Sequence, residues 1–212
     1  MEFNEVIDII RNQHEIGLPG EEAQYALAPK SRARKADYLK NENEYRSSSV
    51  LICIYPSIDN EASVMLIKRT GNSGVHSGQI AFPGGKAEEF DKSLWHTATR
   101  EAEEEVGIKT KSVMPIGELT SLIIPVSNFM VHPFVGYVNK TPEFIANPDE
   151  VHKLVPVPLT NLVSMPVKNK MIETSYGKIE APYFSLHQHD IWGATAMIIS
   201  EFNQMISTAL HR

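Results

Sequence analysis

The sequence has little that would cross-link the chain or anchor it in a membrane. Its 212 residues include a single cysteine, Cys53, which excludes an internal disulfide. Cys53 lies in the apolar run 50–55, which predicts a buried structural thiol and not a nucleophile. No apolar stretch approaches the ~20 residues of a membrane span, and the acidic start lacks the basic segment of a signal peptide. We therefore expect a soluble, cytoplasmic protein.

Positive charge is also in short supply. Lysine and arginine number 20 against 26 aspartates and glutamates, a formal net charge of −6. No basic field is available for nucleic acid or an anionic membrane surface, so neither is expected as a partner. An anionic small-molecule substrate must be met by local cations or a metal ion. The sequence carries no signal for the oligomeric state, and a homodimer stays open.

The length fits one domain with a modest extension. Residues 1–45 are predicted to form an N-terminal helical extension packed on the core, and residues 46–212 the main domain. Phe3, Val6, Ile9 and Ile10 recur at helical spacing, which predicts an opening helix that ends near residues 17–20. The polar stretch 21–46 follows, and its basic cluster at 30–35 is interpreted as a solvated arm or a substrate contact.

Strands are expected at 49–55, 63–69, 113–119, 129–138 and 154–158, with a short helix at 159–163. Residues 171–175 and 179–184 are predicted to form a hairpin near one edge of the sheet. Residues 192–210 are predicted to be a helix whose apolar stripe belongs to the core. This order indicates an α/β or α+β protein with a mixed sheet between helices.

The stretch 82–108 combines a glycine turn, a helix start and a carboxylate cluster. A helix is expected over 91–107, with Asp91 as N-cap and Gly107 as its stop. Glu101, Glu104 and Glu105 share one face, near a helix end that disfavours negative charge. Because oxygen ligands suit hard cations, we predict that these three residues hold Mg²⁺ or Mn²⁺. A solvated acidic helix end is the alternative.

Residues 100–108, REAEEEVGI, with Gly84 and Gly85 before them, resemble the Nudix box G-x5-E-x7-R-E-U-x-E-E-x-G-U, in which U is aliphatic. The match departs from the pattern at two points: Asp91 stands at the first acidic position, and one extra residue precedes Arg100. The resemblance implies the Nudix α/β/α sandwich with a mixed β-sheet between helices, and metal-dependent hydrolysis of a diphosphate linkage.

Other segments resemble the coenzyme A diphosphatase branch of that family. They are LIKRT at 66–70, HSGQIAFPGG at 76–85, NPDEV at 147–151, IWGATA at 191–196 and, before the core, LAP at 27–29. This likeness implies cleavage of coenzyme A or acyl-CoA to 3′,5′-ADP and 4′-phosphopantetheine or its acyl form. Another nucleoside diphosphate derivative, such as ADP-ribose or a dinucleotide, is the alternative substrate. The non-enzymatic alternative is a catalytically inactive domain that senses a nucleotide by binding it.

The predicted catalytic residues are Glu101, Glu104, Glu105 and Arg100; Arg100 is expected to orient a glutamate. The predicted substrate-binding residues are Arg69, His76, Phe82, Gly84, Gly85 and Lys86. Arg69 is expected to contact a phosphate at the end of its strand, with a surface ion pair as the alternative. Glu104 is the first choice for the general base, and Glu150 and Glu173 are loop candidates.

Overall fold

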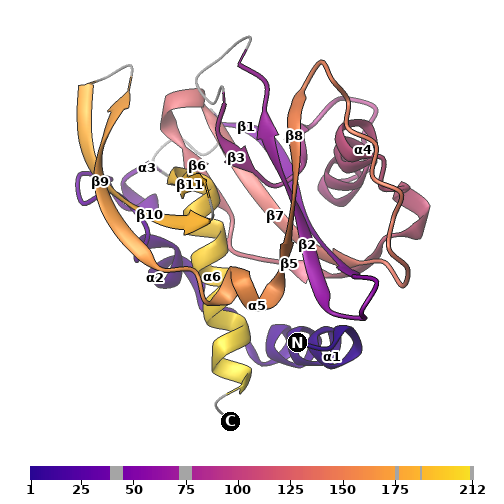
Figure 1. The fold of residues 1–212 in the computed structure, drawn as a ribbon. Coiled ribbons are helices and arrows are strands. Elements are labelled where there is room, and N and C mark those ends of the chain that lie inside the picture. Colours follow the sequence, from indigo (N-terminus) through magenta and orange to yellow (C-terminus); the bar gives the residue numbers. More distant parts are fainter. Residues whose placement is uncertain (39–44, 72–77, 175–176, 187, 211–212) are drawn as a thin grey trace.

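The computed structural model describes residues 1–38, 45–71, 78–174, 177–186 and 188–210. Figure 1 shows its elements, which follow one another in this order: α1 (Phe3–Ile16), α2 (Gly20–Tyr25), α3 (Lys35–Tyr38), β1 (Arg46–Pro56), β2 (Ala62–Arg69), β3 (Ile80–Ala81), β4 (Gly84–Lys86), α4 (Leu94–Val106), β5 (Met114–Glu118), β6 (Leu122–Ile124), β7 (Phe129–Tyr137), β8 (Val151–Pro158), α5 (Leu159–Val163), β9 (Val167–Thr174), β10 (Gly177–Leu186), β11 (His189–Trp192) and α6 (Gly193–Leu210).

Eight strands of the described chain form the main sheet, whose path runs β3-β2-β1-β7-β5, with β4 on β1, β6 on β7 and β8 on β2. β1 and β7 run parallel, with Arg46 opposite Phe129 and Ile54 opposite Tyr137. The other strand pairs of this sheet are antiparallel. The predicted mixed sheet is confirmed. β1 has neighbours on both sides and is covered on both faces, which explains its nearly continuous apolar sequence.

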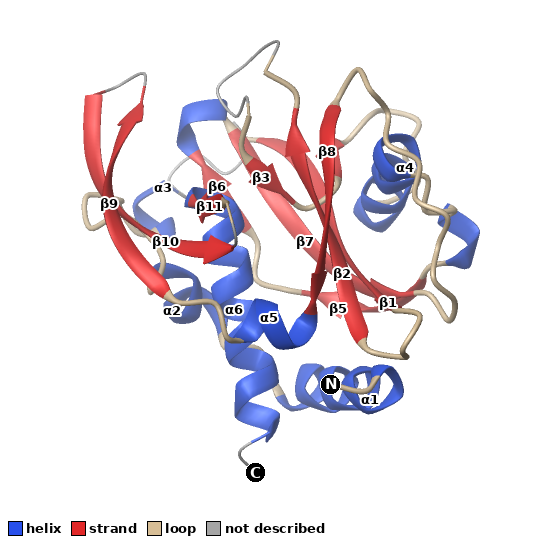
Figure 2. Ribbon diagram, viewed as in Figure 1, coloured by secondary structure: helices blue, strands red, loops and turns tan. Residues whose placement is uncertain are grey.

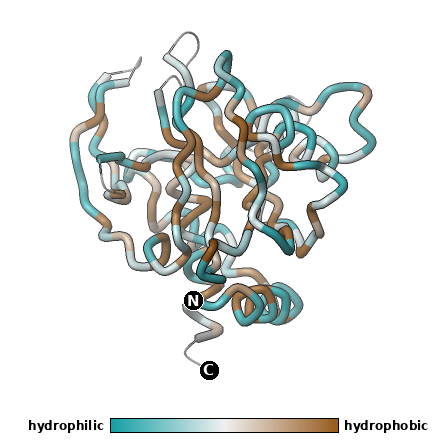
Figure 3. The backbone as a smooth tube through the Cα atoms, turned by 45° about the vertical axis from the view of Figure 1, so that its right-hand side comes forward, coloured by the Kyte–Doolittle hydropathy of each residue, from teal (hydrophilic) through white to brown (hydrophobic). Residues whose placement is uncertain are grey.

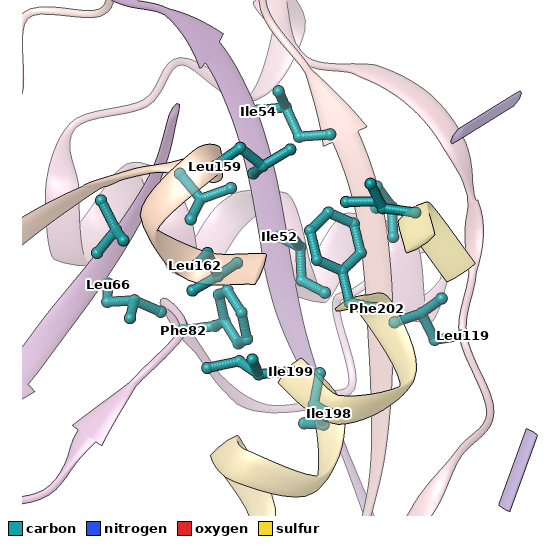
Figure 4. Close-up of a cluster of buried hydrophobic side chains, with 14 of the residues drawn as sticks. Ile52, Ile54, Leu66, Phe82, Leu119, Leu159, Leu162, Ile198, Ile199 and Phe202 are labelled. Atoms are coloured by element: carbon teal, nitrogen blue, oxygen red, sulfur yellow. The ribbon is translucent and has the colours of Figure 1, made fainter. Parts of the chain in front are cut away.

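Helices cover both faces of this sheet (Figure 2). Because side chains alternate along a strand, Leu51 and Cys53 of β1 pack in one cluster with α4, while Ile52 and Ile54 pack in the other with α1, α5 and α6. Figure 4 shows the second cluster, where Phe82 lies near Leu162 and Ile199. The architecture is the α/β/α sandwich that the sequence predicted. Cys53 is buried as predicted, and burial raises the pKa of its thiol to about 12.

The first and last helices pack against each other. α1 buries Phe3, Val6 and Ile10 and ends at Gly17 as predicted, and its apolar side is visible in Figure 3. α6 buries the whole predicted stripe of Ala196, Ile199, Phe202, Met205 and Ile206. The short helices α2 and α3 lie in the polar stretch 21–46, where no helix was predicted. Within the described residues, none of the helices combines the length and apolar character needed to cross a bilayer.

The predicted hairpin exists, but it does not lie at an edge of the main sheet. β9 and β10 pair with each other, and β10 pairs with the four-residue strand β11, in a separate sheet of order β11-β10-β9. This small sheet contacts α6, and β11 contacts β3 of the main sheet. β11 was not predicted, because four residues are too few for a clear alternation. The two sheets therefore flank the start of α6 (Figure 1).

Candidate active site

Helix α4 is shorter at its start than expected. It begins at Leu94 and is capped by Ser93, whose hydroxyl accepts a hydrogen bond from the backbone N–H of His96 at 3.1 Å. The prediction of Asp91 as N-cap was wrong, because Ser93 provides the cap and the Asp91 carboxylate is bonded elsewhere. At the other end Gly107 adopts the left-handed conformation, with φ of 80°, as predicted for the stop.

The carboxylate of Asp91 is nearly inaccessible and binds Arg100. Its two oxygens accept from Nε and Nη2 of Arg100, each at 2.9 Å, and Oδ2 also accepts from the hydroxyl of Thr97. The hydrogen bond to Arg100 lowers the pKa of Asp91 well below its usual range. The same bond raises the pKa of Arg100. Asp91 thus fixes the guanidinium in a bidentate pair.

Arg100 in turn contacts two of the box glutamates. Its Nη1 lies 2.9 Å from Oε1 of Glu101 and 2.9 Å from Oε2 of Glu104. The Glu101 side chain is 13% exposed and that of Glu104 is 51% exposed, so Glu104 is the more open to solvent. Arg100 is placed to orient both carboxylates, as the sequence led us to expect.

Glu105 is the third carboxylate of the helix, and it is fully buried. Its Oε2 accepts from the backbone N–H of Gly84 at 2.8 Å, and its Oε1 lies 3.2 Å from Nη1 of Arg69. Burial raises its pKa to about 7, although Arg69 and the Gly84 hydrogen bond act in the opposite direction. Arg69 therefore pairs with a buried carboxylate, not in the surface ion pair that the sequence left open, and a third of its side chain stays exposed.

The three glutamates share a helix face, but they do not converge on one point. Glu101 and Glu104 turn toward Arg100, whereas Glu105 turns toward Arg69 and β4. No group of three His, Cys, Asp or Glu side chains in the described part of the chain is arranged to hold a metal ion. In this arrangement the two arginines compensate the carboxylates.

The chemistry of these side chains nevertheless fits a divalent cation. Two guanidiniums, of Arg69 and Arg100, face the carboxylates of Asp91, Glu101, Glu104 and Glu105, so negative charge is in excess. The charges of Glu150 and Glu101 both raise the pKa of Glu105. A cation among these oxygens would remove that repulsion, and carboxylate oxygens are the ligands that Mg²⁺ and Mn²⁺ prefer.

Two glycines bring the backbone of β4 close to its neighbours. Gly84 has φ of +156°, and a Cβ on it would lie 2.3 Å from the carbonyl oxygen of Ser49. A Cβ on Gly85 would lie 2.5 Å from the carboxyl carbon of Glu101. Any larger residue at either position would push into β1 or displace Glu101, so both glycines are needed for this contact.

A cleft of about 1550 Å³ lies between the two sheets, and none of the described residues that line it belongs to α4. Arg69, Gly84 and Glu150 line the cleft near the box. Glu105 does not line it but accepts hydrogen bonds from Arg69 and from the backbone N–H of Gly84. The opposite side of its lining comes from the small sheet, the start of α6 and the loop before α3, and includes Ile172, Ile179, Trp192, Thr195, Ile198 and Arg32. The main sheet and its loops also contribute, among others through Val50, Phe82 and Val131.

The remaining predicted residues lie in different surroundings. Phe82 lines the cleft and is 2% exposed within the core (Figure 4). Lys86 does not line it and pairs with Glu88 at 3.4 Å. His76 lies outside the described residues. Glu150 lies in the turn before β8, whereas Glu173, expected in a loop, belongs to β9, lines the cleft and pairs with Lys178.

Sequence reasoning missed most of the far wall of the cleft. Apart from the base candidate Glu173, β9 and β10 were interpreted as an edge hairpin, β11 was not predicted, and α6 was interpreted as core. All four elements contribute lining residues. The signal that would have found them was the pair of stretches 147–151 and 191–196, which resemble one enzyme branch although they lie outside the box. Both stretches border the cleft, through Asp149 and Glu150 and through Trp192 to Thr195.

Known proteins are similar to this chain in sequence. Residues 46–176 match the NUDIX domain family. The chain is 37% identical over 145 residues to the uncharacterized Nudix hydrolase NudL of Photorhabdus laumondii, which covers 68% of this chain and 77% of that protein. It is 38% identical over 148 residues to NudL of Yersinia pestis, which covers 69% of this chain and 74% of that one.

Solved structures at lower identity share the fold. The Nudix hydrolase RenU of M. smegmatis is similar with a TM-score of 0.51 at 15% identity, over 86% of this chain and 94% of that one. A NUDIX hydrolase from Nitrosomonas europaea is similar with a TM-score of 0.50 at 15% identity, over 79% and 73%. Nudix hydrolases act on diphosphate linkages and generally use divalent metal ions. This chain belongs to the Nudix family and is a pyrophosphohydrolase.

Proposed function

We propose that this Nudix hydrolase cleaves the diphosphate linkage of coenzyme A or an acyl-CoA, giving 3′,5′-ADP and 4′-phosphopantetheine or its acyl form. One observation carries the proposal: all five stretches that resemble the coenzyme A diphosphatase branch border a single cleft. The cleft is lined by Pro29, by Arg69 and Thr70, by Gly78, Gln79, Ala81, Phe82 and Gly84, by Asp149 and Glu150, and by Trp192 to Thr195. A protein that resembled this branch only in the Nudix box would not share these segments, which lie outside most of the box.

The cleft suits a long substrate with a charged middle and an uncharged arm. Its volume of about 1550 Å³ exceeds the roughly 300–1,000 Å³ of ordinary ligand pockets. Arg69 and Arg32 provide cations within it, and Ile172, Ile179 and Ile198 provide an apolar wall. A pantetheine arm would pack along this wall while the diphosphate lies beside Arg69.

The hydrolysis needs neutralised phosphoryl charge and an activated water, which bound Mg²⁺ or Mn²⁺ would supply. Glu101, Glu104 and Glu105 would hold the metal. Arg69 would donate to a phosphate oxygen through its exposed side. Glu104 is the most exposed of the three glutamates and would accept the proton from the attacking water; Glu150 is the second candidate for this role.

A substrate panel tests the proposal directly. The protein would be assayed with Mg²⁺ or Mn²⁺ on CoA, acyl-CoA, ADP-ribose, NADH and diadenosine substrates, and the products identified by mass. We expect the highest kcat/KM for CoA or acyl-CoA, with 3′,5′-ADP as a product. A clear preference for any other substrate would overturn the CoA proposal and leave the pyrophosphohydrolase unchanged.

Glu104→Gln should remove nearly all turnover while the fold survives, because the amide can neither accept a proton nor bind a metal with full charge. Its matched control is Glu103→Gln on the same helix, since Glu103 bonds the backbone N–H of Thr110 and lies away from Arg100. Circular dichroism would confirm that both variants fold. Turnover by Glu104→Gln close to that of the control would refute the assigned role.

A further inference from the structure

A second, smaller hollow opens beside the cleft and carries concentrated positive charge. It measures about 380 Å³ and is lined by Tyr25, Ala26, Ala28, Pro29, Lys30, Arg32, Arg34, Val167, Asn169 and Pro182. Three of these residues are cations and none is acidic, in a protein whose net charge is −6. Such a local field attracts an anion against the overall charge of the molecule.

The two arginines of this hollow are held in place around one aromatic ring. The guanidinium carbon of Arg34 lies 4.5 Å from the centroid of the Tyr25 ring, and that of Arg32 lies 6.0 Å from it. The Tyr25 hydroxyl donates to the carbonyl of Ala33 at 2.7 Å, and Nη2 of Arg32 donates to the carbonyl of Ile123. The cations are therefore preorganised by the fold.

Part of their hydrogen-bonding capacity is unused. The Nε of Arg32 is buried and has no hydrogen-bond partner, and neither Arg32 nor Lys30 forms an ion pair with any residue that the structure describes. Arg34 shares its charge with the exposed Glu22, at 3.1 Å. A buried N–H without an acceptor is unfavourable, and an anionic oxygen would satisfy it with a charge-assisted bond.

The hollow joins the cleft but lies well away from the box. Pro29 and Arg32 line both. Ile123, which holds Arg32, pairs with Met130; Met130 pairs with Ser47, and the Ser47 carbonyl accepts from Ala87, just after β4. Three strand spacings of ~4.8 Å separate Ile123 from β4 by about 14 Å. An anion at Arg32 is therefore not a phosphate of the linkage that the box glutamates address.

We propose that Lys30, Arg32 and Arg34 bind a phosphate monoester that the substrate carries at a distance from its diphosphate. The site deepens the proposed function and rests on it, since coenzyme A carries a phosphate on the 3′ oxygen of its ribose. ADP-ribose and unphosphorylated dinucleotides lack this group. The site would therefore select, among nucleoside diphosphate derivatives, those with the additional phosphate.

Lys30→Met tests the site, because Lys30 is exposed and its removal leaves the hydrogen bonds of Arg32 in place. The measured quantity is the ratio of kcat/KM for CoA to that for 3′-dephospho-CoA. We expect the wild-type protein to prefer CoA, and Lys30→Met to lower the ratio about tenfold through KM, the loss of one charge-assisted contact.

Lys168→Met is the matched control. Lys168 lies on β9 between the lining residues Val167 and Asn169, so its side chain points to the opposite face of the strand. It removes the same charge close to the hollow and should keep the wild-type ratio. An unchanged ratio in Lys30→Met, or an equal loss in Lys168→Met, would overturn the proposal.

Binding without turnover separates this site from the proposed reaction. Calorimetric titration of the metal-free protein with 3′,5′-ADP and with 5′-AMP should show tighter binding of 3′,5′-ADP, and Lys30→Met should lose that preference. If CoA is not cleaved but 3′,5′-ADP binds more tightly than 5′-AMP and this preference depends on Lys30, the phosphate site is supported and the CoA reaction is refuted. If CoA is cleaved while 3′,5′-ADP and 5′-AMP bind alike, the phosphate site falls and the reaction stands.

Discussion

Glu105 has the least favourable surroundings of any carboxylate in the box. It is fully buried, and among the described residues one guanidinium and one backbone N–H compensate its charge. The spacing of glutamates placed it correctly on the acidic face of α4. Its burial could not be predicted, because the groups around it come from β2, from β4 and from the loop in which Asn147 donates to the Glu105 carbonyl.

The raised pKa of Glu105 predicts a pH-dependent stability in the metal-free protein. Between pH 4.5 and about 7 the folded protein keeps a proton that the unfolded chain has released, so the free energy of unfolding falls as the pH rises. Relative to wild type, Glu105→Gln should therefore gain up to about 3 kcal/mol across this window. Urea denaturation in EDTA at several pH values measures this difference.

Glu103→Gln serves as the control for this titration. The backbone N–H of Thr110 lowers the pKa of Glu103, so its own titration lies below pH 4.5 and adds no slope above it. A difference between Glu105→Gln and wild type that stays constant from pH 5 to 8 would show that the buried carboxyl is already ionised.

At the scale of the element, α4 followed its sequence signals closely except at its first turn. Ala98 and Ala102, four residues apart, lie on its buried side, and its stop at Gly107 was predicted from conformational preference. The cap moved to Ser93 because Asp91 has a stronger partner. The turn before the helix closes with the backbone N–H of Glu88 donating to Asp91, and this places the carboxylate against Arg100. Local preferences do not reveal such a partner nine residues away.

Asp91→Asn should destabilise the protein by about 3 kcal/mol, because it removes the bidentate carboxylate partner of the mostly buried guanidinium of Arg100. Turnover should fall as well, since Arg100 would no longer hold Glu101 and Glu104. Urea denaturation and steady-state kinetics measure the two effects. Glu88→Gln, which breaks only an exposed pair with Lys86, should change the free energy of unfolding by less than about 0.5 kcal/mol. Equal effects of both changes would contradict the bidentate pair.

At the scale of the molecule, the sequence predicted most strands but not which of them pair. The central contact joins β1 to β7 in parallel, although some eighty residues separate Arg46 from its partner Phe129. No local pattern encodes that register. The small sheet is a similar case. The hairpin of β9 and β10 was predicted from the sequence, but its place in a separate sheet that packs on α6 was not. The cleft is formed by these contacts between segments that lie far apart in the sequence.

Manganese should stabilise the whole domain if the box glutamates hold it. At Mn²⁺ one hundred times its dissociation constant, the free energy of unfolding rises by about 3 kcal/mol, which raises Tm by roughly 5–10 °C for a chain of this size. The combined change Glu101→Gln and Glu105→Gln should abolish this increase, whereas Glu103→Gln should keep it. Calorimetry with and without EDTA measures the shifts. An increase that survives the double change would place the metal elsewhere.

The packing of α1 against α6 joins two helices from opposite ends of the sequence. During translation, the apolar face formed by Phe3, Val6 and Ile10 leaves the ribosome before α6 does. This face stays partly exposed to solvent until α6 is available to pack on it. The growing chain must therefore remain in solution with an incomplete core until the residues of α6 have been made.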